Sequence, residues 1–426
     1  MYHLKNTDMR TLLKLLLIIC AVVIAVACSN EILLDDQAPD HVLQKAAPVL
    51  VIPSTSDDIL TKAAEDWNNL TVALQNACPG DIVQLGEGTF YLHKSVICYN
   101  FNGTLRGAGK GKTIIRTAPG ELFDVSDCPP ISWSFELNEG NFMVCFAQEY
   151  FEGERSVTVK DLTIIADEPT IPFYRRKNKV PWEECNSLHA LMVIYTSLDN
   201  DRDHPVNLNV TYKNLEIIGE KGPEYIYDNS SLFSGLSAFG YSNGIFEAIN
   251  VSILDASGCI KPHGFFGPDS RIIIKDCILK PCTYGIYSFF GHSWTVLNNE
   301  IENAIMGIVL LAPKAMKVTW DGPAGKSFVK DNRMHFSGQM GIGAQYVKNV
   351  EIKDNIITGS GIYGGIVSLA GGNWVIKDND LCGVVSTPIF LLSLKNSVIT
   401  DNINQIMGGA GAADPTNTIG PGRECQ

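Results

Sequence analysis

A short phrase returns at a nearly constant interval in the C-terminal half of the chain, and this interval constrains the fold more than any other feature. The phrase is Lys or Thr followed by Asp-Asn, and its last four aspartates are Asp331, Asp354, Asp378 and Asp401. The steps between them are 23, 24 and 23 residues. Intervals of this size are typical of solenoids, in which each repeat packs on its neighbours.

A column of apolar residues repeats beside this phrase, usually just after a glycine. Its members are Leu236, Ile260, Ile286, Ile308, Ile342, Ile366 and Ile389. One step is long, and its surplus falls at residues 313–326. Alternate apolar residues fit strands with an inward face, and Asp or Asn tolerates the left-handed turn at a corner. Because no Leu-x-x-Leu-x-Leu frame occurs, a leucine-rich repeat is disfavoured. The pattern predicts an all-β chain coiled as a right-handed parallel β-helix.

The region before the repeat predicts a cap for this coil. Residues 57–78 read as an amphipathic helix, which Pro79-Gly80-Asp81 ends before an alternating strand; Arg106–Thr113 follows as RGAGKGKT. This order resembles the opening of the pectin-lyase-like family, in which a helix caps a parallel β-helix. The glycine-rich phrase lacks P-loop spacing. We expect the capped helix to span 57–408, with a C-terminal extension at 409–426.

The N-terminus predicts export and lipidation. Basic residues precede an apolar run at 15–26, and Ala25-Val26-Ala27-Cys28 resembles the bacterial lipobox. The run is short for a membrane-spanning helix, so an uncleaved signal anchor is the weaker alternative. We expect a signal peptide at 1–27, lipid on Cys28 and a tether at 28–56. Ser29 after the cysteine favours the outer membrane, and the acidic residues Glu31, Asp35 and Asp36 are compatible with display at the cell surface. The membrane is then contacted only through the lipid.

Charge and cysteines set further limits. The net charge is −13, and removing the leader with its +2 leaves −15, which disfavours nucleic acid as a partner. A local basic cleft can still bind an anionic polysaccharide. Among the 12 cysteines, two pairs invite a disulfide, Cys128–Cys145 and Cys277–Cys282, and buried thiols are the alternative. No Cys-x-x-Cys pair indicates a zinc ribbon.

Candidate site residues lie one and three positions after the inward column. There, polar and aromatic side chains gather in the repeats that start at residues 236, 260 and 286. Lys261 and His263 share one outward strand face, with Tyr287 on the next repeat. We predict catalytic roles for these three. The neighbouring Phe239, Phe289 and His292 are predicted to bind substrate.

The family resemblance implies what such residues do. Polysaccharide-active β-helices bind glycans along an outward strand face; their lyases use a Lys, Arg or His base and often Ca²⁺ to hold a uronate carboxylate. Lys261 or His263 is then the base and Tyr287 the acid. The loop 172–185 supplies Arg175, Arg176 and Trp182 as further substrate contacts. Asp199, Asp201 and Asp203 are weak metal candidates without a full calcium-loop pattern.

These features favour a cell-surface protein that processes an acidic glycan as a lyase, hydrolase or epimerase. A non-catalytic glycan-binding or adhesin-like β-helix is the alternative. A purely structural role is a third, because the outward Val309, Leu311, Phe390 and Leu392 are apolar. No complete catalytic motif separates these readings, since fold alone does not assign activity.

Overall fold

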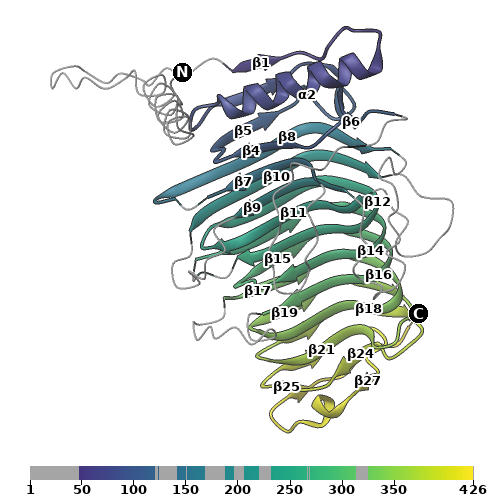
Figure 1. Cartoon of the computed structure of the whole chain (residues 1–426). Helices are drawn as coiled ribbons and strands as arrows, with labels where there is room; N and C mark the ends of the chain where they lie inside the picture. The colour runs from purple at the N-terminus through teal and green to yellow at the C-terminus, as the bar shows by residue number, and fades with distance from the viewer. Residues whose placement is uncertain are drawn as a thin grey trace, which may run out of the picture. The chain divides into compact units, whose positions relative to one another are not determined.

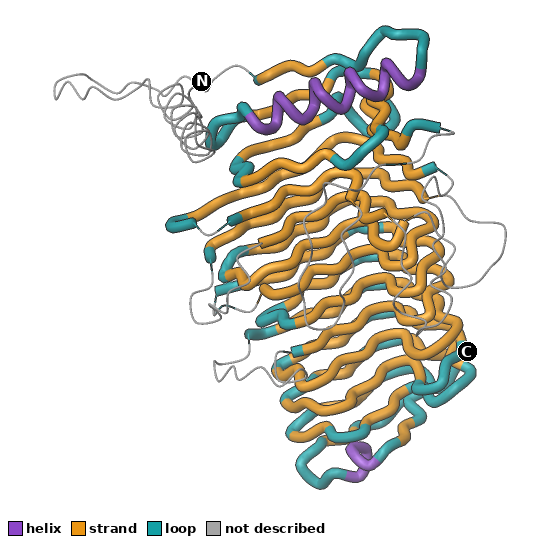
Figure 2. The backbone as a smooth tube through the Cα atoms, viewed as in Figure 1, coloured by secondary structure: helices purple, strands orange, loops and turns teal. Residues whose placement is uncertain are grey.

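Parallel strands coil through most of the chain into a continuous sheet, as the computed structural model shows (Figures 1 and 2). The structure describes residues 48–119, 123, 142–149, 151–167, 188–195, 206–219, 232–265, 267, 269–312 and 325–425. Every pairing between its named strands is parallel, and strand register passes from one coil to the next on three faces. The predicted parallel β-helix is confirmed.

The first face is formed mainly by short strands. These are β1 (Val49–Val51), β2 (Ile82–Leu85), β5 (Gly103–Arg106), β13 (Arg271–Lys275), β15 (Trp294–Leu297), β17 (Ser327–Lys330), β19 (Val350–Lys353), β22 (Val375–Lys377), β26 (Val398–Thr400) and β28 (Thr418–Ile419). The strands confined to the second face are β3 (Gly88–Leu92), β6 (Thr113–Thr117), β20 (Ile356–Gly359) and β23 (Asp380–Val384).

The third face carries the candidate site. Its own strands are β4 (Val96–Tyr99), β7 (Phe142–Gln148), β9 (Leu188–Tyr195), β11 (Leu232–Ser242), β21 (Gly364–Gly372), β24 (Ile389–Leu391), β25 (Leu394–Lys395) and β27 (Met407–Gly408). Longer strands bend around corners and join faces: β8 (Glu154–Ala166), β10 (Asn207–Gly219), β12 (Ile245–Phe265), β14 (Ile278–Phe289), β16 (Glu300–Leu311) and β18 (Arg333–Lys348).

The core is the inside of the coil. All seven residues of the apolar column predicted from the sequence are fully buried there. Successive members are register partners, as Leu236 is with Ile260 and Ile260 is with Ile286. A side chain in this column therefore packs on its counterparts one coil away, which explains why the sequence repeats it.

Helix α2 (Ile59–Gln75) covers the N-terminal end of the coil (Figure 1) and packs against β3 and β4. The carboxylate of Asp58 accepts a hydrogen bond from the Thr61 N–H at 2.9 Å and so caps the helix. Leu70 and Leu74 are buried on its inner side. The predicted capping helix is present, with shorter bounds than 57–78.

The corner between the first and second faces explains the Asp-Asn phrase. Asp331, Asp354, Asp378 and Asp401 all have φ of 56–57°, the left-handed conformation expected of them. The next residue in each coil is an asparagine whose side chain points inward. These asparagines, with one from the coil before, form a buried column that we call the asparagine ladder: Asn299, Asn332, Asn355, Asn379 and Asn402.

Each asparagine side chain of the ladder donates a hydrogen bond to the next asparagine in the column. The Nδ2 of Asn355 donates to the Oδ1 of Asn379 at 2.8 Å, and the backbone N–H of Asn355 donates to the same oxygen at 3.1 Å. The Nδ2 of Asn355 also donates to the Val329 carbonyl inside the coil. Gln405 ends the ladder by accepting from Asn402 at 2.9 Å. The hydrogen bonds of this buried polar column therefore join neighbouring coils of the repeat to one another.

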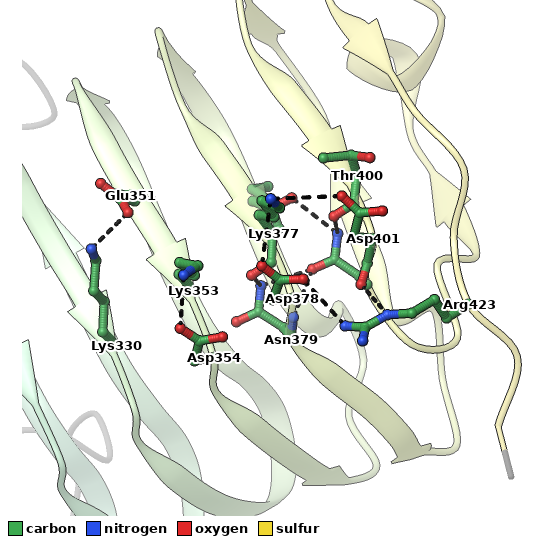
Figure 3. Close-up of polar contacts among 12 residues, drawn as sticks. Lys330, Glu351, Lys353, Asp354, Lys377, Asp378, Asn379, Thr400, Asp401 and Arg423 are labelled. Atoms are coloured by element: carbon green, nitrogen blue, oxygen red, sulfur yellow. Dashed lines mark hydrogen bonds and ion pairs between the residues drawn. The ribbon is translucent and has the colours of Figure 1, made fainter.

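Charged side chains line the outside of the same corner (Figure 3). Lys330 pairs with Glu351 at 2.6 Å, and Lys377 lies 3.8 Å from Asp401. Arg423 contacts Asp378 at 3.4 Å and donates from Nε to the Asp401 carbonyl. These groups are partly exposed, so each pair adds little to stability.

The ends of the coil differ from the boundaries expected from the sequence. Strand β1 lies within the range assigned to the tether, yet it pairs with β2. Strand β28 lies within the range assigned to the C-terminal extension, yet it pairs with β26. Backbone pairing thus draws both segments into the β-helix. The predicted signal peptide at 1–27 and residues 28–47 lie outside the described residues, and none of the described helices has the length and hydropathy to cross a bilayer.

Cys277 and Cys282 follow the buried-thiol alternative rather than the predicted bridge. Both are free and buried, so the disulfide predicted between them does not form. Cys145 is buried, and its predicted partner Cys128 lies outside the described residues. Cys277 and Cys282 belong to the inner side of the coil, where thiols behave as small apolar groups. A disulfide joins Cys382 to Cys425 instead and fastens the last residues to β23.

Candidate functional site

Strands β9, β11, β12 and β14 lie side by side on the third face and carry the predicted catalytic side chains. Ser237 on β11 is the register partner of Lys261 on β12. His263 is the partner of Phe239 on one side and of Phe289 on the other. Because strand side chains alternate, these residues share the outward side while Ile260 points inward. The structure thus brings together the outward residues that the sequence placed on neighbouring coils.

Burial sets this group apart from an ordinary outer surface. Lys261 and His263 are each only 5% exposed. A buried charge or imidazole requires specific surroundings, so a solvated surface lysine is not what the structure shows. Tyr287 and Phe289 are half-buried beside them. We call His189, Lys261, His263 and Tyr287 the basic–aromatic cluster.

Aromatic rings surround His263. Its ring centroid lies 4.6 Å from that of Phe239, 4.8 Å from Phe289 and 6.3 Å from Tyr287. Tyr287 and Phe289 lie 4.5 Å apart in an edge-to-face arrangement. These rings come from three successive coils, so the repeat itself positions them.

One hydrogen bond defines the protonation pattern of His263. The backbone N–H of Phe289 donates to its Nδ1 at 3.0 Å. Burial, reinforced by the positive charge of Lys261, holds the pKa of His263 well below its ordinary value. The imidazole is therefore neutral at pH 7, and its single proton resides on Nε2. His263 presents a hydrogen-bond donor at that atom rather than a vacant lone pair.

His189 on β9 joins the cluster, and sequence reasoning missed it. Its side chain is 6% exposed, and burial together with the charge of Lys261 lowers its pKa to about 3. His189 also influences His263 electrostatically, so the three basic groups lie near one another. The signal was hidden because β9 reads as a continuous apolar run, LHALMVIY, before the recognisable repeat begins.

Lys261 is held in a particular conformation over its own strand. A Cβ atom built on Gly258 would lie 2.0 Å from Cε of Lys261 and 2.9 Å from its Nζ. The lysine stem therefore folds back across Gly258, and a side chain at position 258 would displace it. Nearby, the hydroxyls of Ser234 and Ser237 hydrogen-bond to each other. The Tyr212 hydroxyl donates to the Ser237 carbonyl at 3.0 Å from inside the coil.

The outward side changes character along the third face. Toward the N-terminus it is a buried apolar group composed of Ile97, Phe142, Cys145, Ala147, Met192 and Ile194, with Phe239 packed against it. Toward the C-terminus it becomes apolar again at Val309 and Val367, both buried. On this side, the described residues with a buried charged or imidazole group are His189, Lys261 and His263, on the coils between.

The remaining predicted site residues lie elsewhere. His292 stands in the turn after β14, where a Cβ on Gly325 would approach its Cδ2 to 2.9 Å, and burial lowers its pKa. Arg175, Arg176, Trp182, Asp199, Asp201, Asp203 and Cys28 lie outside the described residues. Within the described residues, no three His, Cys, Asp or Glu side chains gather in a way that could hold a metal ion. The Ca²⁺ prediction therefore stays a prediction.

Comparison with known proteins reveals shared fold without close kinship. No family model and no curated protein matches the chain. The solved structure of DFA-IIIase from Arthrobacter chlorophenolicus A6 matches with a TM-score of 0.52 and 11% identity over 85% of this chain and 90% of that one. A polygalacturonase from Erwinia carotovora matches at 0.49 and 11% identity, over 92% and 100%. The A-module of mannuronan C-5 epimerase AlgE6 from Azotobacter vinelandii matches at 0.45 and 13% identity, over 84% and 95%. Identities this low show the fold alone.

Proposed function

We propose that this chain processes an acidic polysaccharide at the basic–aromatic cluster. The observation that carries the proposal is the burial of Lys261 and His263, two residues apart on the outward side of strand β12. Perturbed pKa values cluster at functional sites, so buried titratable groups of this kind are candidates for function. The Asp-Asn corner shows how this chain builds structural polar groups, and the cluster does not repeat in that way.

The cluster supports proton transfer next to a sugar carboxylate. In β-elimination, a base removes the proton on the carbon beside the carboxylate, and an acid protonates the departing glycosidic oxygen. Lys261 acts as the base once its ammonium group has lost a proton, and Tyr287 acts as the acid. His263 cannot accept the proton at Nδ1, because the Phe289 N–H occupies that lone pair. Its Nε2–H instead donates to the negative charge that develops on the substrate carboxylate.

A second candidate is a glycan-binding protein without turnover. The 5% exposure of Lys261 favours it, since a reacting sugar ring must reach the amine, whereas a bound glycan can rest on the half-buried Tyr287 and Phe289. In that case the protonated lysine neutralises a carboxylate and the rings pack on sugar faces.

A polysaccharide panel separates the two candidates. Purified protein is incubated with polygalacturonate, alginate and a neutral glucan. Unsaturated-product absorbance reports elimination, new reducing ends report hydrolysis, and proton NMR of the sugar ring reports epimerisation. We expect turnover of an acidic glycan. Binding without any turnover would replace the first candidate with the second, and neither binding nor turnover would reject both.

We further propose that the protein is exported and lipidated at Cys28. The small residues before Cys28, at the end of an apolar run, support this. Expressed in a Gram-negative host, the wild type should partition into the detergent phase on Triton X-114 extraction, and Cys28→Ser should remain in the aqueous phase. Equal partitioning of the two would remove the anchor from the proposal.

A further inference from the structure

The edge where the third face turns toward the first contains two residues of an unexpected type. Eighteen non-glycine residues in the described part of the chain have φ between 50° and 59°, and sixteen of them are Asn or Asp. The other two are Phe290 and Tyr346, each with φ of 57°. A bulky aromatic residue in the left-handed region is a genuine outlier, because its side chain lacks the local hydrogen bonds that help Asn and Asp.

Three of four successive coils hold a positive φ at this corner, and the fourth, at Ala312, does not. His263, Phe289, Leu311 and Gln345 are register partners on four successive coils. The residues that follow three of them are Gly264 with φ of 86°, Phe290 and Tyr346. Glycine adopts positive φ without strain, so Gly264 shows what the corner favours when only the turn matters. Phe290 and Tyr346 hold the same turn at a conformational cost.

Strained residues persist where function requires their side chains. Phe290 adjoins Phe289, whose backbone N–H holds His263 and whose ring centroid lies 6.1 Å from that of Phe290. Tyr346 lies two coils further along, at roughly 10 Å along the helix axis, and is 39% exposed. The two aromatic residues therefore lead from the basic–aromatic cluster along one edge of the coil.

We propose that Phe290 and Tyr346 are stacking platforms for sugar rings of the bound polysaccharide. The glycan then runs along this edge, parallel to the helix axis, with one ring on each platform. This inference rests on the proposed glycan site and extends it toward the C-terminal end. It explains why aromatic residues occupy positions where Asn, Asp or Gly would hold the backbone with less strain.

The decisive variants are Phe290→Asn and Tyr346→Asn, because asparagine suits the left-handed turn and removes the ring. We expect each to raise the Tm, measured by circular dichroism, by about 1–3 °C. Each should weaken glycan affinity about three- to tenfold. Affinity is measured by electrophoresis in gels containing polygalacturonate or alginate. Phe328→Asn is the matched control, since Phe328 is a partly exposed aromatic residue of β17 on the first face.

Each outcome decides. Unchanged affinity in both variants, while the wild type binds, overturns the inference and leaves the proposed function standing. A lower Tm in both variants would assign the two rings to packing and also overturn it. If the wild type binds no glycan in the panel, the proposed function fails, whatever the Tm values show. Should one variant fail to fold, the other still tests the inference through the same two measurements.

Discussion

Two sets of buried polar side chains in this β-helix follow different rules. The asparagine ladder repeats once per coil, and each amide is bonded to the next. The basic–aromatic cluster lies on one face, on strands β9, β12 and β14, without any repeat, and its groups are titratable. A ladder stabilises the turn that every coil needs, so the sequence repeats it. A group that serves a reaction is needed only once. Buried polar groups that do not repeat from coil to coil are therefore the ones to assign to function.

The largest expected effect is the loss of turnover when Lys261 of the basic–aromatic cluster is substituted. Lys261→Ala should lower turnover of the acidic glycan by about 10²–10⁴-fold, the range that a general base contributes. Lys261→Arg keeps the charge but not the base, so it should retain glycan affinity and lose turnover. Circular dichroism checks that both variants remain folded. Full activity in Lys261→Ala would show that Lys261 is not the base.

The ladder should show the opposite response. Asn355→Leu removes the oxygen that Asn332 donates to and leaves the Val329 carbonyl without that donor. Each unsatisfied buried group costs about 1–3 kcal/mol. We therefore expect the free energy of unfolding, measured by urea denaturation, to fall by about 3 kcal/mol. Turnover per folded molecule should not change. Asn373→Asp is the control, because Asn373 donates to Asn349 at an exposed corner and aspartate keeps its left-handed φ of 59°. A loss of turnover in folded Asn355→Leu would erase the distinction between the two sets.

The pH dependence of the free energy of unfolding should also distinguish the two sets, because the asparagine ladder has no titratable group. The pKa of His189 is about 3 in the folded chain, held down by burial and by Lys261. Since the unfolded value is about 6.5, the unfolded chain takes up the proton first as the pH falls. This contribution to the free energy of unfolding is therefore complete above about pH 6.5 and is lost toward pH 3, by up to about 1.4 kcal/mol per pH unit.

His189→Gln should flatten that dependence. Urea unfolding of the wild type and the variant at several pH values between 4 and 7 measures it. His335→Gln is the control, because His335 is exposed and bonded to Thr358. If the wild type and His189→Gln lose stability in parallel as the pH falls, His189 is not a buried neutral imidazole.

The sequence predicted periodic features well and non-periodic ones poorly. The spacing of the inward column located the coil and the outward positions of Lys261 and His263. It missed His189, because that strand precedes the regular repeat and reads as apolar throughout. It also could not give the burial of Lys261, since burial of an outward side chain depends on contacts that no repeat encodes. Cys382 and Cys425 are 43 residues apart, and only the coiling brings them together.

The smallest expected effect comes from comparing the outer charged side chains of the Asp-Asn corner with its inner amides. Lys377 lies 3.7 Å from Asp378 and 3.8 Å from Asp401, and its side chain is 41% exposed. Exposed ion pairs contribute about 0–1 kcal/mol, so Lys377→Met should shift the free energy of unfolding by no more than that. Asn379, two residues away and inside the coil, donates to Asn402 at 2.8 Å, and Asn379→Leu should cost several times as much. Urea unfolding of both variants measures the ratio. Equal losses would mean that the outer charges, and not the inner amides, hold this corner.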